Sequence, residues 1–318
     1  MVDVEHVTQR FGNTVAVDDI SFTVAEGENL VLLGTSGCGK TTTLKMINKL
    51  ITPTVGCVKV NGKDIAGQPA IQLRRGIGYV LQHNSLFLHY TVAENIATIP
   101  GLLKWSKDDI DNRVTELLVK LHLDPEKYRN SYPAQLSGGQ QQRVNIARAL
   151  AAQPPLLLMD EPFGALDTVT RTAIRKEFKE LDEFKKKTII MVTHDVQEAF
   201  ELGDRICLMD KGKIVQIGTV RDLLNKPAND FVRSFLDDQR LQLTFQTIKL
   251  AELWPFVESS GQEGAMLKIR LEDTLWMAMQ LLDGAEEKNA MLALTDQGVV
   301  KNVTWGILMQ AYNIYKQK

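Results

Sequence analysis

Cysteine is scarce in this sequence of 318 residues, which holds only Cys38, Cys57 and Cys207. The three lie far apart and form no C-x-x-C pair, so neither a disulfide framework nor a zinc site is expected, and a reducing compartment fits better. Long apolar runs are also missing: none approaches the roughly 18 residues that a membrane-spanning helix needs. Because the first residues hold no basic or apolar segment, we expect no signal peptide and a cytosolic protein.

An excess of charge of one sign is missing as well. The 37 Lys and Arg residues nearly balance the 39 Asp and Glu residues, which gives a formal net charge of −2. This balance offers no basic surface for nucleic acid and no polybasic membrane anchor. The hydrophobic share of 44% and the charged share of 24% are ordinary for a globular protein and exclude disorder, collagen and coiled coil. The length suits one large domain with a smaller one attached.

Short apolar segments alternate with amphipathic ones over residues 1–236. Alternating strands and helices predict an α/β domain with a largely parallel sheet. A helix is predicted where apolar residues recur at helical spacing after Asp108 and Asp109. Strands are predicted at 20–24, 30–33, 57–60 (entering a hairpin turn at 61–62), 156–159 and 188–192.

The pattern changes near residue 237. Residues 237–262 predict a linker with some helix, and residues 263–318 predict a small separate α+β domain. Because so small a domain buries little surface alone, we expect it to pair with a partner. Its predicted β-α-β-β-α order is strand 267–271, helix 275–282, strand 291–294, a turn at 296–298, strand 299–303 and helix 305–315.

Residues 34–41, Gly-Thr-Ser-Gly-Cys-Gly-Lys-Thr, fit the phosphate-loop pattern G-x-x-x-x-G-K-[ST]. The glycines let successive backbone N–H groups point at phosphate oxygens, and the following helix N-terminus adds positive potential. Lys40 is expected to reach the β- and γ-phosphates of a nucleotide, and the Thr41 hydroxyl to bind Mg²⁺. A glycine-rich turn is the alternative, which the position between a buried strand and a helix disfavours.

Two adjacent carboxylates, Asp160 and Glu161, follow the predicted strand 156–159. Ligands of α/β proteins bind at the carboxyl ends of the strands. Asp160 is expected to hold Mg²⁺, usually through water, and Glu161 to accept a proton from, or polarise, the attacking water. Alone, such a pair is more often a helix cap or a solvated edge, but together with the phosphate loop it predicts nucleotide hydrolysis.

A second candidate anion site lies at residues 136–140, Leu-Ser-Gly-Gly-Gln, which run into another predicted helix. Taken alone, Ser-Gly-Gly is usually a turn. A chain with two phosphate-binding helix starts needs either two nucleotides or a partner subunit.

Several motifs stand in the order and spacing that is typical of ATP-binding-cassette (ABC) ATPases: the phosphate loop, Gln82, LSGGQ, the Asp160-Glu161 pair, residues 165–167 and residues 193–195. Residues 1–236 therefore resemble this family. The resemblance implies a P-loop NTPase cassette: a RecA-like core with an antiparallel β subdomain and a helical subdomain. It also implies a homodimer in which two subunits sandwich two ATP molecules head to tail.

The resemblance further implies a role for single residues. Ser137 and Gly139 would contact the γ-phosphate of ATP held by the other subunit, and Asp167 would cross the interface. Phe11 stands where the family stacks an aromatic ring on adenine. The residues thereby expected to bind nucleotide are Phe11, Gly34, Thr35, Ser36, Gly37, Cys38, Gly39, Lys40, Thr41, Thr42, Ser137, Gly138, Gly139, Gln140 and Asp167.

In the same family Gln82 would touch the Mg²⁺ and the water and report ATP to the membrane partner. His194 would contact the γ-phosphate and orient the water. The expected catalytic residues are therefore Glu161, His194, Lys40 and Gln82. The expected metal ligands are Thr41, Gln82 and Asp160.

Residues 42–51, 73–75, 102–106, 160–167 and 227–232 further resemble importers of glycine betaine, choline, carnitine and related osmoprotectants. This implies an ATPase subunit bound to transmembrane permease subunits at the cytoplasmic face of the membrane, served indirectly by a substrate-binding protein. The sequence departs from this pattern at two places: Thr168 stands where proline is common, and Asn145-Ile146 stands where glycine and valine are frequent. These departures leave the identity of the transported compound open.

Residues 265–318 look like one cystathionine-β-synthase-type (CBS) motif, a regulatory element that such ATPases often carry in tandem. A small dimerisation domain without a ligand is the alternative for this segment. Trp254, Trp276 and Trp305 offer rings for a quaternary ammonium cage, although ordinary core packing is the favoured reading.

Other functions compete with an osmoprotectant importer. An importer ATPase for an amino acid or another small cation has the same motifs. A soluble ABC ATPase acting in translation or DNA repair usually carries two cassettes or a coiled-coil insertion, which this sequence lacks. A non-catalytic regulatory protein is disfavoured by the intact Lys40, Glu161 and His194.

Overall fold

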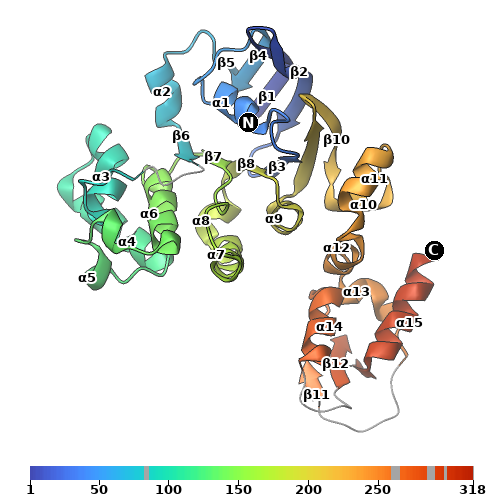
Figure 1. Cartoon of the computed structure of the whole chain (residues 1–318). Coiled ribbons are helices and arrows are strands. Elements are labelled where there is room, and N and C mark those ends of the chain that lie inside the picture. Colours follow the sequence, from blue (N-terminus) through green and yellow to red (C-terminus); the bar gives the residue numbers. More distant parts are fainter. Residues whose placement is uncertain (82–85, 259–265, 285–290, 297–298, 318) are drawn as a thin grey trace. The chain divides into compact units, whose positions relative to one another are not determined.

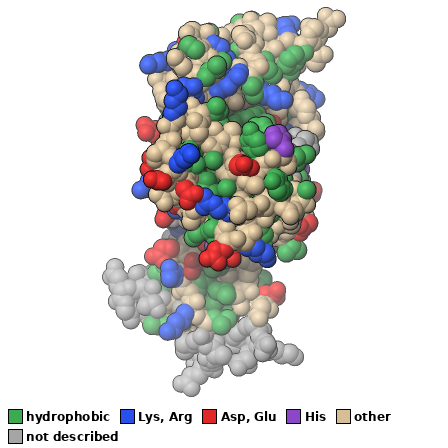
Figure 2. Space-filling view, turned by 90° about the vertical axis from the view of Figure 1, so that its left-hand side faces the viewer, with side chains coloured by type: hydrophobic (Ala, Val, Ile, Leu, Met, Phe, Trp, Pro, Cys, Tyr) green, Lys and Arg blue, Asp and Glu red, His purple; other side chains and the backbone are tan. Residues whose placement is uncertain are grey.

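The computed structural model (Figure 1) describes residues 1–81, 86–258, 266–284, 291–296 and 299–317. The chain divides into two compact units, residues 1–220 and 221–318. No helix among these described residues is long and apolar enough to cross a membrane. On the face shown in Figure 2, basic and acidic side chains are both present with hydrophobic ones between them, which agrees with the balanced composition.

A six-stranded sheet forms the centre of the first unit, in the order β10-β9-β3-β8-β7-β6. Its neighbouring strands run parallel except for β10, which pairs antiparallel with β9. Strands β7 and β8 are buried throughout, as the continuous apolar runs predict for a parallel sheet. The strands are β3 (Asn29–Gly34), β6 (Ile77–Val80), β7 (Leu156–Asp160), β8 (Thr188–Thr193), β9 (Arg205–Asp210) and β10 (Lys213–Thr219). The predicted parallel α/β core is thus confirmed.

Helices follow the strands of this sheet, and a second, antiparallel sheet packs into the same hydrophobic core. The helices are α1 (Lys40–Ile47), α7 (Thr168–Glu180), α8 (Asp182–Lys185) and α9 (Val196–Leu202). The second sheet has the order β2-β1-β4-β5. It consists of β1 (Val2–Phe11), β2 (Thr14–Val24), β4 (Val55–Val60) and β5 (Lys63–Asp64), followed by α2 (Ala70–Arg75). The predicted hairpin is confirmed, because β4 and β5 pair antiparallel across Asn61 and Gly62.

A helical region lies between β6 and β7 in the chain, and Figure 1 shows it set to one side of the six-stranded sheet. It contains α3 (Val92–Leu102), α4 (Lys107–Lys120), α5 (Pro125–Tyr128), the 3₁₀ turn η1 (Pro133–Gln135) and α6 (Gly138–Leu150). The two acidic residues that predicted the start of α4 lie in its first turn, where Ser106 caps the helix.

Arg113 ties this helical region to the sheet core. Its side chain is 4% exposed and donates hydrogen bonds to the carbonyls of Leu150 and Ala151 at the end of α6. It also lies 3.1 Å from Glu183 of α8, which Lys120 contacts at 2.8 Å. A buried charge needs such partners, because leaving it unpaired is costly.

We expect Arg113→Met to lower the free energy of unfolding by about 3 kcal/mol, since it leaves a carboxylate short of a partner and two helix carbonyls without donors. Lys120→Met is the matched control, because the half-exposed Lys120 belongs to the same cluster and its loss should cost under about 1 kcal/mol. Urea unfolding of both variants tests this. Equal losses would show that Arg113 does not hold the two regions together.

The same cluster predicts a pH dependence. Burial raises the pKa of Glu183, but the hydrogen bonds from Arg113 and Lys120 outweigh burial and lower that pKa from 4.5 to about 2. A carboxyl with a depressed pKa stabilises the fold above its ordinary pKa and loses that contribution as the pH falls through the folded value. Unfolding measured from pH 5 to pH 2 should therefore lose less stability in Glu183→Gln than in the parent, and parallel curves would contradict the prediction.

The second unit begins earlier than the sequence predicts. Its helices before the small sheet are α10 (Val220–Asn225), α11 (Asp230–Asp237), α12 (Arg240–Thr247), α13 (Leu250–Leu253) and the 3₁₀ turn η2 (Trp254–Phe256). Phe245, Leu250 and Leu253 are buried in the core of this unit. The described part of the predicted linker 237–262 is therefore folded into this unit, because its apolar residues pack against the small sheet and its helices and do not face solvent.

The predicted β-α-β-β-α order of the tail is confirmed for the described residues. It consists of β11 (Met266–Lys268), α14 (Leu275–Asp283), β12 (Met291–Asp296), β13 (Val299–Val303) and α15 (Trp305–Lys316), with the sheet order β11-β12-β13. Strand β11 ends before the predicted residue 271, because the carbonyls of Leu271 and Asp273 accept hydrogen bonds from the start of α13. Residues 297 and 298 of the predicted turn lie outside the described residues.

Candidate nucleotide site

The loop between β3 and α1 has a backbone that only glycine tolerates at two positions. Gly34 has φ 153° and Gly39 has φ 104°, both in the region that disfavours side chains. A Cβ on Gly34 would lie 2.1 Å from the carbonyl oxygen of Met209, and one on Gly39 would lie 2.6 Å from that of Ala16. The glycines of the motif therefore let the loop curl closely against its neighbours.

The ammonium group of Lys40 lies inside this curl. Lys40 is 5% exposed, and its Nζ donates hydrogen bonds to the carbonyls of Gly34 at 2.9 Å and Thr35 at 2.8 Å. No carboxylate among the described residues lies within ion-pair distance of this Nζ. Its third partner is the Cys38 thiol, with Sγ at 3.7 Å. A buried cation held by neutral groups alone favours an anion beside it, and a phosphate meets that need.

Beside the loop, the Thr41 hydroxyl donates a 2.7 Å hydrogen bond to Oδ1 of Asp160 at the end of β7. Asp160 is 3% exposed; burial raises its pKa, and the bond from Thr41 opposes that rise. A cation next to this carboxylate would relieve the cost of burying its charge. Hydroxyl and carboxylate oxygens are ligands that suit Mg²⁺. The two residues therefore fit the metal that the sequence motif implies.

The described residues hold no group of three or more His, Cys, Asp or Glu side chains that is arranged to bind a metal. A cation at Thr41 and Asp160 would thus take its other ligands from water and phosphate oxygens, as Mg²⁺ commonly does. The third expected ligand, Gln82, lies outside the described residues.

Glu161 and His194 meet at the ends of neighbouring strands. Glu161 follows β7 and His194 follows β8, which run parallel and side by side, so their carboxyl ends lie at one edge of the sheet. Nδ1 of His194 lies 3.2 Å from Oε1 of Glu161. Glu161 has φ 43°, a strained value for a residue other than glycine, and such strain is typical of functional positions.

Two arginines that the sequence analysis did not single out support this edge. Arg171 and Arg175 of α7 form ion pairs with Asp195 at 3.5 Å and 3.9 Å. Asp195 directly follows His194 and caps α9 by accepting a hydrogen bond from the backbone N–H of Glu198. The spacing of four residues places both arginines on one face of a predicted helix, but it does not show that Asp195 is the residue they contact.

The Ser137 segment forms a second, separate helix start. Ser137 Oγ accepts a hydrogen bond from the backbone N–H of Gln140 at 3.3 Å, and Oε1 of Gln140 accepts one from the backbone N–H of Ser137 at 2.9 Å. This capping box begins α6. A Cβ on Gly139 would lie 2.7 Å from Cγ2 of Thr170, so α6 and α7 approach closely here. No hydrogen bond between described residues joins this segment to the phosphate loop.

The remaining expected residues differ in exposure: Cys38 is buried, whereas Thr35, Ser36, Gly37 and Gly138 are exposed. Phe11 ends β1 with its side chain 49% exposed, which leaves the ring free to stack. Asp167 caps α7 by accepting hydrogen bonds from the backbone N–H groups of Thr170 and Val169. Hydrogen bonding from the side chain and then the backbone of Thr170 lowers the pKa of Asp167. Thr42, in the first turn of α1, is half-buried beside the loop.

Comparison with known proteins agrees with this architecture. Residues 17–164 match the ABC transporter family. The chain is 43% identical over 304 residues to the choline transport ATP-binding protein OpuBA of Bacillus subtilis (strain 168), covering 95% of this chain and 77% of that protein. It is 46% identical over 278 residues to the glycine betaine uptake system ATP-binding protein YehX of Escherichia coli (strain K12), covering 86% and 89%.

A solved structure shares the fold of the first unit. It is the ATP-binding cassette MJ0796 in a dimeric post-hydrolysis state bound to ADP and Pi, with a TM-score of 0.62 and 35% identity over 69% of this chain and 98% of that chain. The predicted fold class is thereby confirmed for the cassette. With the phosphate loop and the strand-end carboxylates in place, and with relatives of this identity and coverage, the chain belongs to the family of ABC transporter ATP-binding proteins, the ABC ATPases.

Proposed function

We propose that this chain is the ATP-hydrolysing subunit of an ABC importer for an osmoprotectant such as glycine betaine, carnitine or choline. Two copies would work as a head-to-tail homodimer on permease subunits at the cytoplasmic face of the membrane. The observation that supports hydrolysis best is the meeting of Glu161 and His194 beside the Thr41–Asp160 pair, because it combines a base, a polar partner and a metal site.

Each residue of the site has a chemical task in this proposal. Lys40 would exchange its carbonyl partners for phosphate oxygens, to which a cation bonds more strongly. Thr41 and Asp160 would hold Mg²⁺, which neutralises phosphate charge when bound. Glu161 would accept the proton of the attacking water, and His194 would hold the Glu161 carboxylate in place and donate toward the γ-phosphate.

The relatives support the proposed substrate class. The similarity to the choline transport protein spans 95% of this chain, so it includes most of the second unit as well as the cassette. A relative named for glycine betaine uptake covers 86% of the chain. Resemblance over both units favours an osmoprotectant over the amino acid that the shared cassette motifs leave open.

Transport in proteoliposomes tests the substrate. The chain would be reconstituted with the permease and substrate-binding protein of its transporter, and uptake of radiolabelled glycine betaine, carnitine, choline and glycine would be measured with and without ATP inside. We expect ATP-dependent uptake of at least one quaternary amine and none of glycine. Uptake of glycine alone, with ATP hydrolysis intact, would refute the substrate class and leave the ATPase assignment standing.

We also propose that the CBS-like tail pairs with the tail of a second copy. Val300 and Trp305 are each about half exposed, and Met277 of α14 and Ile314 of α15 are exposed as well. Exposed apolar side chains of this kind favour a self-complementary contact. A Val300→Glu, Trp305→Glu double variant should weaken dimers measured by analytical ultracentrifugation without nucleotide, while the exposed Leu102→Glu should not. Equal dimerisation of the parent, the double variant and Leu102→Glu would show that the tail is not part of the dimer interface.

A further inference from the structure

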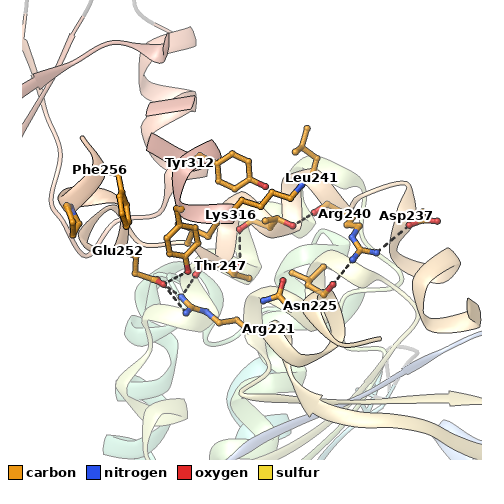
Figure 3. A pocket seen from close by; sticks show the side chains of 15 residues that line it. Arg221, Asn225, Asp237, Arg240, Leu241, Thr247, Glu252, Phe256, Tyr312 and Lys316 are labelled. Atoms are coloured by element: carbon orange, nitrogen blue, oxygen red, sulfur yellow. Dashed lines mark hydrogen bonds and ion pairs between the residues drawn. The ribbon is translucent and has the colours of Figure 1, made fainter. Parts of the chain in front are cut away.

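The second unit contains a cavity of about 860 Å³ that no motif in the sequence indicates. Figure 3 shows its lining, which comes from α10, α11, α12, α13, η2 and α15. The volume lies within the range of about 300 to 1,000 Å³ that is typical of small-molecule sites.

The less exposed acidic side chain of this cavity, Glu252, is already satisfied. Glu252 accepts hydrogen bonds from both terminal nitrogens of Arg221, from the Tyr315 hydroxyl at 2.9 Å and from the backbone N–H of Lys249 at 3.1 Å. Asp237 is exposed and lies 3.7 Å from Arg240. Glu252 is therefore not a ready acceptor for a cationic ligand.

The hydrogen-bond donors, in contrast, are largely unused. Tyr312 is 6% exposed, yet its hydroxyl has no hydrogen-bond partner among the described residues, and neither does the ammonium of Lys316. Figure 3 shows the ends of these two side chains on the same side of the cavity, near Leu241. Arg240 donates to the Leu224 carbonyl at 2.7 Å but holds Asp237 only at 3.7 Å. Lys316 is an exposed residue, and an unpaired cation beside an unpaired hydroxyl favours an anionic acceptor.

Aromatic rings supply the apolar part of the lining. Phe256, Tyr312 and Tyr315 all border the cavity. The Tyr312 ring is fixed edge-on against Phe245, with 5.0 Å between ring centroids. A planar or apolar ligand body can pack against such rings.

We propose that this cavity binds a small organic anion with a ring, its oxyanion held by Tyr312, Lys316 and Arg240 and its ring packed against Phe256 and Tyr315. The shared chemistry is a phosphate or carboxylate on a planar body. A quaternary ammonium cage fits poorly here because Glu252 is already satisfied, and the face of Trp254 is occupied by Lys301, whose Nζ lies 4.2 Å from the ring centroid. Binding at this cavity does not require ATP hydrolysis, so this proposal does not depend on the proposed ATPase function.

Calorimetric titration of the full chain tests the proposal with 1-naphthyl phosphate, 1-naphthoate, 1-naphthol and inorganic phosphate. Because the phosphate loop can also bind an anion, the titrations are repeated in Lys40→Ala. We expect naphthyl phosphate or naphthoate to bind Lys40→Ala at least about tenfold more tightly than naphthol or inorganic phosphate does, since charged hydrogen bonds and ring packing act together. The tighter of the two identifies the oxyanion.

Tyr312→Phe and Lys316→Met should each weaken that binding about tenfold, because each removes one donor to a charged group. Lys268→Met is the matched control: Lys268 is an exposed lysine of the same unit that does not border the cavity, and its loss should change nothing. Binding of naphthol as tight as that of the anions, no binding to Lys40→Ala, or full affinity in both donor variants would each overturn the proposal.

Discussion

Glu161→Gln is expected to lower ATP hydrolysis by about a hundredfold or more while nucleotide still binds. The amide keeps the size of the side chain and can still contact His194, but it cannot accept a proton from water. The carboxylate lies 3.2 Å from Nδ1 of His194 and is held by a strained backbone, so few other groups can take its place. Steady-state hydrolysis and equilibrium nucleotide binding, measured on the same preparation, give the two readouts.

Glu180→Gln serves as the matched control, because Glu180 is an exposed glutamate of α7, and hydrolysis should be unchanged. Lys40→Ala should fail differently, by weakening nucleotide binding itself, since it removes the buried cation of the phosphate loop. Turnover by Glu161→Gln at the parental rate would show that another group accepts the proton.

Mixing inactive Lys40→Ala chains with inactive Ser137→Arg chains is expected to restore hydrolysis. In the proposed head-to-tail dimer, each ATP lies between Lys40 of one chain and Ser137 of the other. A mixed dimer then has one intact site and one site with both defects. Random assembly would give about a quarter of the parental activity, because half of the dimers are mixed and each has one working site.

The control mixture combines Lys40→Ala chains with Thr41→Ala chains, whose defects lie on the same loop. Every site in those mixed dimers keeps one damaged loop, so activity should stay near zero. Recovery in the first mixture but not in the second would support the shared site. No recovery in the first mixture, or full activity of an isolated monomer, would contradict it.

The sequence by itself determined the features that depend on neighbouring residues. Continuous apolar runs identified the strands of the parallel sheet, because a strand buried on both faces needs apolar residues throughout. The spacing of Gly34, Gly39 and Lys40 identified the phosphate loop, because backbone curvature and a nearby cation are local requirements. The tail order β-α-β-β-α was readable for the same reason.

Only the tertiary structure decided which distant residues meet. The contact of Glu161 with His194, the bonds of Arg113 to α6 and α8, and the placement of Arg171 beside Asp195 all join segments far apart in the chain. The packing of residues 240–257 into the second unit and the cavity at Tyr312 are also of this kind. Periodicity shows that a residue has an apolar or polar face, but it does not show what that face touches, because the partner is chosen by the packing of the whole chain.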